Sequence, residues 1–556
     1  MALPVGLLAQ PQFQAPMDIP LVLSGNFMEI RSDHFHSGID IKTQGREGIP
    51  VRSVAAGWVS RIKVSPWGYG HALYIDHGNG YTSVYGHLSA YKGAIAAATL
   101  KAQYKARSFA IDIYPEKGEL PVAQGAVIAL SGNSGGSGGP HLHFEIRRNS
   151  DQFALDPESL GIDIRDNIPP TIRGVRLHGL APDSRVSPYP GNAVGFATQG
   201  SNGKYALKPG NTIAALGPVG FSVHTVDTYN DSHNTCGVRR IRVLVDSAVV
   251  QTVSLAAVDW DKQRYCNAHA EYALFKKDNM HYHRCYRMPG DHLDIYGDEM
   301  EGGRFTPEPG KVHQVRVEVT DANGNLSTLE FPLSGATSEE AARWPGPAPL
   351  VDPLRWNALS TLARPGVRLT VPAGGLYEDV SQEYRQLPAR TGMLSPIHVL
   401  QDPLTPLHKR ATLAIEVGEL PAGVRTKAVI VKVEGSKVSS EGGTYADGWI
   451  TTEVKRFGAF SVQLDTVPPR IVPVDLRSDM RGRQDLTVRI GDDLSGVDSY
   501  SATLDGQWIM MAYEPKRGTL THTFDAHSEG TGQRELVLTV VDERGNSNVL
   551  KQTFQR

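Results

Sequence analysis

Short segments of alternating apolar and polar residues, separated by glycine, asparagine and proline turns, extend along most of this 556-residue chain. One pair, Ala72–Asp76 and Tyr81–Tyr85, flanks the turn sequence His77-Gly78-Asn79-Gly80. Alternation with a period of two is typical of strands, and a glycine-rich turn between two such runs is typical of a hairpin. Glycine and proline supply 57 and 36 residues, more than average usage. We therefore expect a mainly β protein, and the length predicts about three to five domains.

The overall charge and hydropathy exclude two classes of partner. The net charge of −3 provides no basic field for a phosphate backbone, so nucleic acid is not an expected partner. No apolar run approaches the roughly 20 residues of a membrane-spanning helix, so no membrane span is predicted. Residues 1–23 contain a short apolar stretch without a basic n-region, which we interpret as a leader or signal remnant, with a disordered start as the alternative.

An internal repeat organises the C-terminal two thirds of the chain. Residues 167–172 and 466–471 share a Pro-Pro pattern, and the segments that follow them contain similar motifs in the same order. The matched pairs are Val226-Asp227 with Gly491-Asp492, and the Asp321-to-Asn325 segment with the Asp542-to-Asn546 segment. Two copies of one β module are predicted, the first module at 167–335 and the last module at 466–556. Their strand spacing favours immunoglobulin-like sandwiches, the first with an insertion at about 255–305.

The two copies are joined by a linker and a further module. Residues 336–350 are a predicted linker, in which a short helix begins at Thr337 with a Thr337 and Glu340 capping box. Proline and glycine then stiffen residues 345–349. Residues 351–465, the middle module, are predicted to be β-rich, and they contain no catalytic pattern.

The first histidine motif lies in residues 24–160 and reads Arg31-Ser32-Asp33-His34-Phe35-His36-Ser37-Gly38-Ile39-Asp40. In an extended strand, the Cα atoms of His36 and Asp40 would stand about 13 Å apart, too far to share an ion. Gly38 can supply a bend or bulge between them. By itself the pair is more typical of a structural hydrogen bond than of a metal site.

Two further motifs are Val84-Tyr85-Gly86-His87-Leu88 and Gly138-Gly139-Pro140-His141-Leu142-His143-Phe144-Glu145-Ile146. Alternation places His141 and His143 on one face of a strand and apolar neighbours on the other. Each histidine alone could be merely structural. Two neutral imidazoles and one carboxylate, however, make a three-ligand zinc site that keeps a fourth position open, as catalytic zinc requires.

These motifs, in this order, resemble the lysostaphin and LytM-type (β-lytic) zinc metalloendopeptidases, which cut peptide bonds in bacterial peptidoglycan. The glycine-rich turns Ser65–Gly70 and Ser131–Gly136 also match, and the resemblance covers residues 24–160. It implies a LytM-like β-sheet peptidase domain that binds one Zn²⁺. The implied zinc ligands are His36, Asp40 and His143; the implied catalytic pair, which polarises water and stabilises the oxyanion, is His87 and His141. Between these two histidines, an insertion with a helix at about 92–105 lies beside the cleft.

Other residues with metal-ligating side chains have simpler interpretations. His34 is interpreted as a rim residue, and His71 and His77 as structural. The cluster Cys266, His269, His281, His283 and Cys285 favours a Cys266–Cys285 disulfide or free thiols over a metal site. The pair Asp492-Asp493 and the segment Asp321 to Asn325 could bind calcium, but Asx turns are the favoured explanation.

The sequence thus predicts a zinc endopeptidase of peptidoglycan, exported to the periplasm, cell envelope or extracellular space. The β modules would anchor or position the enzyme and could contact envelope partners. Two alternatives are a non-catalytic regulator of wall hydrolases and an envelope adhesion protein. Because all five motif positions are present, loss of catalysis is disfavoured. No residue pattern selects the bond, a glycine bridge or a D-alanine to diamino acid crosslink; the crosslink is favoured because glycine bridges are the narrower specialisation.

Overall fold

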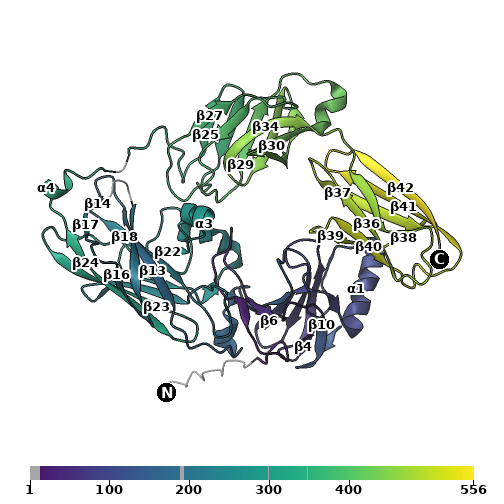
Figure 1. Ribbon diagram of the computed structural model, residues 1–556, viewed down its shortest axis with the longest axis horizontal. Helices are drawn as coiled ribbons and strands as arrows, with labels where there is room; N and C mark the ends of the chain where they lie inside the picture. The colour runs from purple at the N-terminus through teal and green to yellow at the C-terminus, as the bar shows by residue number, and fades with distance from the viewer. Residues whose placement is uncertain (1–12, 188–192, 298–299, 347) are drawn as a thin grey trace, which may run out of the picture.

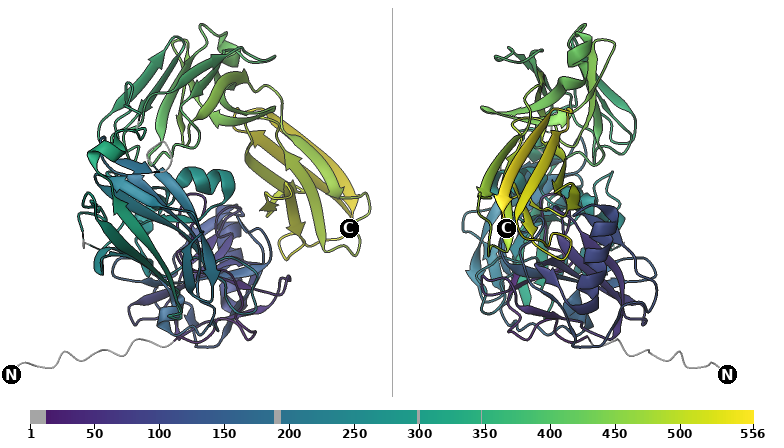
Figure 2. Two further views of the ribbon diagram at one scale, coloured as in Figure 1. Left: turned by 60° about the vertical axis from the view of Figure 1, so that its left-hand side comes forward. Right: turned by 90° about the vertical axis from the view of Figure 1, so that its right-hand side faces the viewer.

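The computed structural model describes residues 13–187, 193–297, 300–346 and 348–556 (Figure 1). Four groups of strands follow one another around a ring, and the last group returns to the first, as Figures 1 and 2 show. Within the described residues, no helix has the length and apolar character needed to cross a membrane. The start of the predicted leader, residues 1–12, lies outside the described residues.

The N-terminal domain is built on a ten-stranded sheet with the central order β1-β2-β11-β6-β5-β4-β8. A three-stranded sheet, β3-β10-β7, lies beside it. The strands of the large sheet are β1 (Leu23–Gly25), β2 (Ile39–Lys42), β4 (Gly57–Val64), β5 (His71–Asp76), β6 (Tyr81–Leu88), β8 (Ile111–Ile113), β9 (Pro121–Val122), β11 (His141–Arg148), β12 (Ala154–Leu155) and β21 (Ala257–Val258). The small sheet consists of β3 (Pro50–Arg52), β7 (Ala90–Tyr91) and β10 (Val127–Leu130).

Strand β11 shows how alternation positions the site. Leu142, Phe144 and Ile146 are fully buried in the domain core, which leaves His141 and His143 on the opposite face. The predicted hairpin is also present, because β5 and β6 pair antiparallel across the His77 to Gly80 turn. The mainly β fold predicted for the domain is therefore confirmed.

Part of the segment assigned to a leader belongs to this core. Phe13, Met17 and Leu23 are buried, and all three pack in the same apolar cluster as the sheet strands. For residues 13–23 the prediction of a leader is therefore corrected. Three dispersed apolar residues in a Pro-rich stretch carry no periodic signal, so only their packing against the sheet reveals their place.

Two predicted helices are present. Helix α1 (Gly93–Ala106) ends at Arg107, whose left-handed φ of 47° terminates it. The helix α4 (Ser338–Ala341) begins with the predicted capping box between Thr337 and Glu340.

The first module contains an eleven-stranded sheet, and its insertion carries three short helical segments. The strands are β13 (Thr171–Gly179), β14 (Arg185–Ser187), β15 (Ala193–Ser201), β16 (Lys204–Leu207), β17 (Ile213–Leu216), β18 (Val219–Val226), β19 (Arg240–Val245), β20 (Ala248–Ser254), β22 (Tyr282–Arg284), β23 (Val312–Thr320) and β24 (Leu326–Gly335). The helical segments are η2 (Trp260–Tyr265), α2 (Cys266–His269) and α3 (Tyr272–Asp278).

The N-terminal domain and the first module share their cores. Strand β21 of the insertion pairs with β12 and so extends the N-terminal sheet. Tyr229 and Cys236 of the first module pack in the N-terminal core, while Phe27 and Phe35 of the N-terminal domain pack in the core of the first module. The two parts therefore stabilise each other.

The middle and last modules each consist of two sheets. The middle module has the sheets β25-β26-β29-β33-β32 and β27-β28-β34-β30-β31; the last has β35-β36-β40-β39 and β38-β37-β41-β42. The middle strands are β25 (Ser360–Arg364), β26 (Val367–Val371), β27 (Tyr384–Leu387), β28 (Ile397–Leu400), β29 (Ala411–Glu416), β30 (Ala428–Glu434), β31 (Lys437–Gly442), β32 (Thr444–Ala446), β33 (Trp449–Val454) and β34 (Gly458–Leu464), with η3 (Ala422–Lys427). The last strands are β35 (Arg470–Asp475), β36 (Asp485–Gly491), β37 (Val497–Leu504), β38 (Gln507–Ile509), β39 (Ala512–Glu514), β40 (Thr519–Thr523), β41 (Gln533–Asp542) and β42 (Ser547–Gln555).

Equivalent strands of the two repeats pair in the same way. An antiparallel pair follows the Pro-Pro segment, β13 with β18 and β35 with β36. The final hairpin is β23 with β24 in the first module and β41 with β42 in the last. The immunoglobulin-like description of these repeats stays a prediction.

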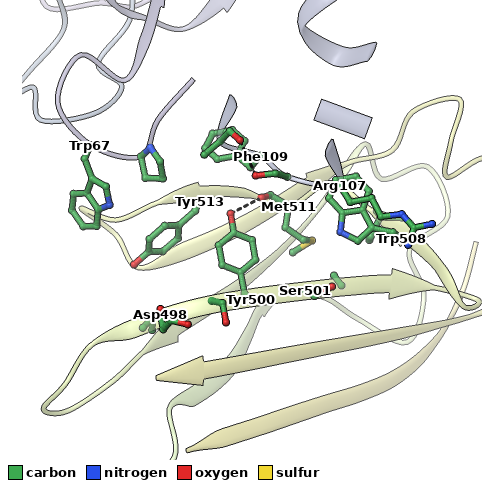
Figure 3. Close-up of a pocket in the computed structure, with 16 residues that line it drawn as sticks. Trp67, Arg107, Phe109, Asp498, Tyr500, Ser501, Trp508, Met511 and Tyr513 are labelled. Carbon is green, nitrogen blue, oxygen red and sulfur yellow. Dashed lines mark hydrogen bonds between the residues drawn. The ribbon is translucent and has the colours of Figure 1, made fainter. Parts of the chain in front are cut away.

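Side chains of the last module contact the N-terminal domain and so close the ring. The Tyr104 ring stacks on His527 with centroids 3.7 Å apart, and Lys516 Nζ donates to the carbonyls of Asn133 and Ser137. Between the two parts lies a pocket of about 260 Å³ with aromatic walls (Figure 3). Trp67 and Phe109 form one side of it, and strands β37 and β38 with the loop after them form the other.

Candidate active site

Strand register brings the first and second histidine motifs together. β2 pairs antiparallel with β11 so that Asp40 lies opposite His143. A Cβ atom on Gly38 would stand 2.2 Å from the carbonyl oxygen of Phe144, so only glycine lets the chain pass this close to β11. Gly38 therefore acts by permitting close approach, and the short loop before β2 places His36 beside Asp40.

Three predicted ligand atoms form a compact triangle. His36 Nε2 lies 3.0 Å from Asp40 Oδ1 and 3.0 Å from His143 Nδ1, and His143 Nδ1 lies 2.9 Å from Asp40 Oδ1. The edge of a tetrahedron with zinc-ligand bonds near 2.0 Å is about 3.3 Å, close to these separations. All three residues are buried. The donor types and spacing therefore fit a zinc ion.

The remaining ring nitrogens are fixed by acceptors. His36 Nδ1 donates to the carbonyl of Asn26 at 2.7 Å, and His143 Nε2 donates to Glu145 Oε1 at 2.8 Å. Because both acceptors lack a proton to give, His36 Nε2 and His143 Nδ1 are the nitrogens left to bind a metal. Burial lowers the pKa of His143, but hydrogen bonds to Asp40 and Glu145 raise it overall to about 9. The two carboxylates around His143 therefore favour a positive charge at this position.

Glu145 is the functional residue that the sequence interpretation missed. It is fully buried; its Oε1 also accepts from Ser37 at 2.5 Å and from the Tyr69 hydroxyl, and its Oε2 accepts from Arg147 Nε at 2.7 Å. The Tyr69 ring stacks on His143 with centroids 4.9 Å apart. The available signal was the alternation of β11, which puts Glu145 on the same face as His143.

The two predicted catalytic histidines flank the triangle. His87 Nδ1 donates to the carbonyl of Ser134 and His141 Nδ1 to that of Gly139, each at 2.8 Å. Both rings therefore keep Nε2 free of the backbone, and His141 Nε2 lies 3.4 Å from Asp40 Oδ1. The ring centroids of His87 and His141 are 4.8 Å apart.

The backbone and the environment of His87 are both unusual. Its φ of 58° lies in the left-handed region, which few residues other than glycine adopt and which is concentrated at functional sites. Burial and the neighbouring His143 and His141 lower its pKa to about 3. His87 is therefore a neutral imidazole at neutral pH.

The first module supports the triangle from outside the N-terminal domain. Asn26, whose carbonyl orients His36, exchanges two hydrogen bonds with the backbone of Gly237: Asn26 Nδ2 donates to the carbonyl at 2.8 Å, and Gly237 N donates to Oδ1 at 2.7 Å. Trp260 of η2 lies under the Arg147 guanidinium, 4.1 Å from its carbon to the ring centre. Arg31 donates to Asp40 Oδ2 at 2.9 Å, which fixes the carboxylate.

Other histidines and the cysteines lie elsewhere. His34 is half exposed and contacts Asp33, while His77 bonds Ser83 and the Ala56 carbonyl. His71 is next to Tyr91, with ring centroids 5.8 Å apart. In the insertion, His269 Nε2 and His283 Nδ1 are 2.8 Å apart. Cys236, Cys266 and Cys285 are buried free thiols, so of the two favoured alternatives for the last two, the free thiols are present.

A β-sheet domain with a buried His-Asp-His triangle and two flanking histidines defines the LytM and lysostaphin class of domain. Residues 34–102 match the model of peptidase family M23, so the chain carries a domain of that family, as the motifs predict. Residues 351–465 match a Zu5-like domain.

Curated relatives match a short part of the chain. The DD-carboxypeptidase/endopeptidase Mpg of Neisseria meningitidis serogroup B is 36% identical over 114 residues, which are 20% of this chain and 20% of that protein. The murein hydrolase activator EnvC of Escherichia coli is 32% identical over 114 residues, with the same coverage of 20% of each chain. The matched region thus spans about a fifth of the length of these relatives.

Two solved structures are similar to about a quarter of the chain. The catalytic domain of the M23 protein EnpA from Enterococcus faecalis is 24% identical, with 27% of this chain and 96% of that chain covered and a TM-score of 0.20. The catalytic domain of lysostaphin from Staphylococcus simulans is 22% identical, with 25% and 90% covered and a TM-score of 0.19.

Proposed function

We propose that this protein is a zinc-dependent endopeptidase that hydrolyses peptide bonds in bacterial peptidoglycan. The observation that carries the proposal is the triangle of His36 Nε2, Asp40 Oδ1 and His143 Nδ1. The other ring nitrogen of each histidine donates to an acceptor, so the nitrogens of the triangle are left to bind a metal. When bound, zinc would act as a Lewis acid toward the scissile carbonyl and would lower the pKa of a water molecule from 15.7 to about 7.

The other residues would handle protons and geometry. Because His87 Nδ1 donates to the Ser134 carbonyl, the lone pair of its Nε2 is available to accept the proton of the attacking water. With Nδ1 held by the Gly139 carbonyl, His141 in its imidazolium form would donate a hydrogen bond from Nε2 to the oxyanion that develops on the carbonyl oxygen. Asn26 and Glu145 would keep the two ligand rings in their binding tautomers.

Peptidoglycan is proposed as the substrate because the relatives of this domain carry the names of a DD-carboxypeptidase/endopeptidase and a murein hydrolase activator. Among its bonds, the D-alanine to diamino acid crosslink remains the favoured one. Because peptidoglycan lies outside the cytoplasmic membrane, we place the protein in the periplasm, the cell envelope or the extracellular space. The β modules would position the enzyme there and could contact envelope partners.

A second candidate is a regulator of other wall hydrolases, which the likeness to an activator favours. All five motif residues are present and gathered at one place, which favours the enzyme. Mass analysis of crosslinked peptidoglycan fragments incubated with the zinc-loaded protein separates the two. We expect dimers to become monomers, and we expect no cleavage with His141→Ala or after chelation. Zinc-loaded protein that cleaves nothing would instead favour the regulator.

A more subtle change tests the support of His143. Glu145→Gln keeps the size of the side chain but replaces a carboxylate that accepts from His143 with an amide. Loss of such a partner typically lowers metal affinity 10- to 100-fold, and we expect a decrease of about that size here. Competition with a zinc chelator measures it. Glu116→Gln, at an exposed position in the same domain, is the matched control and should leave the affinity unchanged.

A further inference from the structure

Three aspartates meet at the junction between the N-terminal domain and the first module. Asp166 precedes the Pro-Pro segment, Asp227 follows β18 and Asp321 follows β23. One carboxylate oxygen from each lies within 4.8 Å of the others. Asp227 is 1% exposed and Asp321 is 2% exposed. This acidic junction is separate from the triangle of the candidate active site.

Within the described part of the chain, no cationic side chain pairs with the carboxylate of Asp227. Neither Oδ1 nor Oδ2 makes a hydrogen bond of acceptable geometry, and Oδ2 of Asp166 is also without one. A buried carboxylate without a partner is unfavourable by several kcal/mol, so such groups normally bind a cation or a proton. Burial first, and then the neighbouring Asp321 and Asp166, raise the pKa of Asp227 well above its usual range.

Further carboxylates near the three aspartates add negative charge to the junction. Glu158, which accepts from the Tyr229 hydroxyl at 2.7 Å, has a pKa raised by burial and by the aspartates of this region. The guanidinium of Arg239 is paired with Asp156. The acidic junction therefore concentrates negative charge.

The junction between the middle module and the last module contains the same three positions, but there the carboxylates have hydrogen-bond donors. Asp465, Asp492 and Asp542 also lie within 4.8 Å of one another, in the equivalent places of the repeat. There, backbone amides satisfy the carboxylates: Leu494 N and Gly496 N donate to Asp492, and Ser495 N donates to Asp465. In the first module a longer loop, residues 228–235, follows Asp227. Backbone amides thus donate to Asp492 in the second copy of the repeat, whereas the equivalent Asp227 in the first copy accepts no hydrogen bond of acceptable geometry.

The third position is conserved in detail between the copies. Asn325 donates through its backbone and side-chain nitrogens to the two oxygens of Asp321, each at 2.8 Å. Asn546 does the same for Asp542, at 2.8 and 2.7 Å. The predicted Asx turn is present at Asp492, to which Leu494 N donates, whereas the bonds from Asn325 and Asn546 span four residues. They hold each carboxylate rigidly while leaving lone pairs for a further ligand.

We propose that Asp166, Asp227 and Asp321 bind one calcium ion. All three donors are hard oxygens, which excludes metals that require imidazole or thiolate. Calcium accepts 6 to 8 oxygens in irregular arrangements, as loop carboxylates supply, whereas magnesium demands a near-octahedral set and retains its water. This proposal does not depend on zinc or on peptidase activity.

A calcium ion at the acidic junction would stabilise the connection between the N-terminal domain and the first module. Asn323 Nδ2 donates to the carbonyl of Ile164 at 3.0 Å, so the loop that carries Asp321 already holds the end of the N-terminal domain. A shared ion would add Asp166 in the connection and Asp227 to the same point. The first module, whose Gly237 fixes Asn26 behind His36, would then be held more firmly.

The test is a calcium titration of the full-length protein, stripped of metal and then reloaded with one equivalent of zinc. We expect calorimetry to show one additional calcium per chain and thermal unfolding to shift upward by several degrees. Magnesium should bind at least about 10-fold more weakly. Absence of calcium binding to the wild-type protein would overturn the proposal.

Variants in the two copies locate the ion. Asp227→Asn should abolish the calcium response and, because it removes an unpaired charge, should raise the unfolding temperature without calcium. Asp166→Asn, at a partly exposed position, should also abolish the response and serves if the first variant does not fold. The matched control, Asp492→Asn in the last module, should keep the wild-type affinity. Unchanged binding in the first two variants, or its loss in the control alone, would contradict the assignment.

Discussion

Replacement of His143 by alanine is expected to remove stoichiometric zinc and to lower the rate of peptidoglycan cleavage by about 1000-fold or more. His143 Nδ1 is one corner of the ligand triangle, and its other nitrogen anchors the ring to Glu145. Loss of Lewis-acid catalysis removes several kcal/mol of transition-state stabilisation, and each 1.36 kcal/mol is a factor of ten in rate. Metal analysis of the purified variant and mass analysis of the reaction products measure the two effects.

His34→Ala is the matched control for this change. His34 lies two residues before His36, is half exposed and contacts Asp33 rather than the triangle. Zinc content and cleavage rate should both stay at the wild-type values. If His143→Ala keeps one zinc per chain and its activity, or if His34→Ala loses them, the assignment of the ligands is wrong.

Removal of residues 168–556 is expected to unfold the N-terminal domain rather than to release an active peptidase. Phe27, Met28, Ile30 and Phe35 are buried against the first module, and Tyr229 and Cys236 fill the N-terminal core. Exposure of four large apolar side chains would be unfavourable by roughly 6 to 12 kcal/mol, as large as the total stability of a typical domain. Circular dichroism during thermal unfolding should show no cooperative transition.

A shorter truncation provides the comparison. Removal of residues 466–556 breaks the surface contacts of Tyr104 and Lys516 but leaves the shared core intact. This variant should unfold cooperatively and bind one zinc. A stable, zinc-binding fragment that ends at residue 167 would show that the first module is dispensable for the fold of the N-terminal domain.

Local patterns were sufficient for much of the fold. Alternation along residues 141–148 decided which side chains of β11 face the core, and the glycine-rich turn at residues 77–80 decided the hairpin of β5 and β6. The Ala-rich run predicted α1 to within a residue at each end. These features depend on neighbours in sequence, where the periods of strands and helices act directly.

The candidate ligands could be proposed from residue types, but their support could not. Asn26 and Gly237 are 211 residues apart, and no periodicity links a loop of one domain to a turn in another. Residues 13–23 likewise show their role only when Phe13 and Met17 pack against the sheet. Such contacts arise from the packing of complete elements.

By itself, the sequence determined the mainly β class, the repeat, the domain family and the residues able to hold zinc. The tertiary structure alone decided that the first module completes the N-terminal core and that its insertion extends the sheet. It also decided that Asp227 lacks the amide partners that Asp492 has, although the two sequences look alike. The physical reason is that hydrogen-bond satisfaction and burial are set by the path of distant segments, whereas strand and turn preferences are set by adjacent residues.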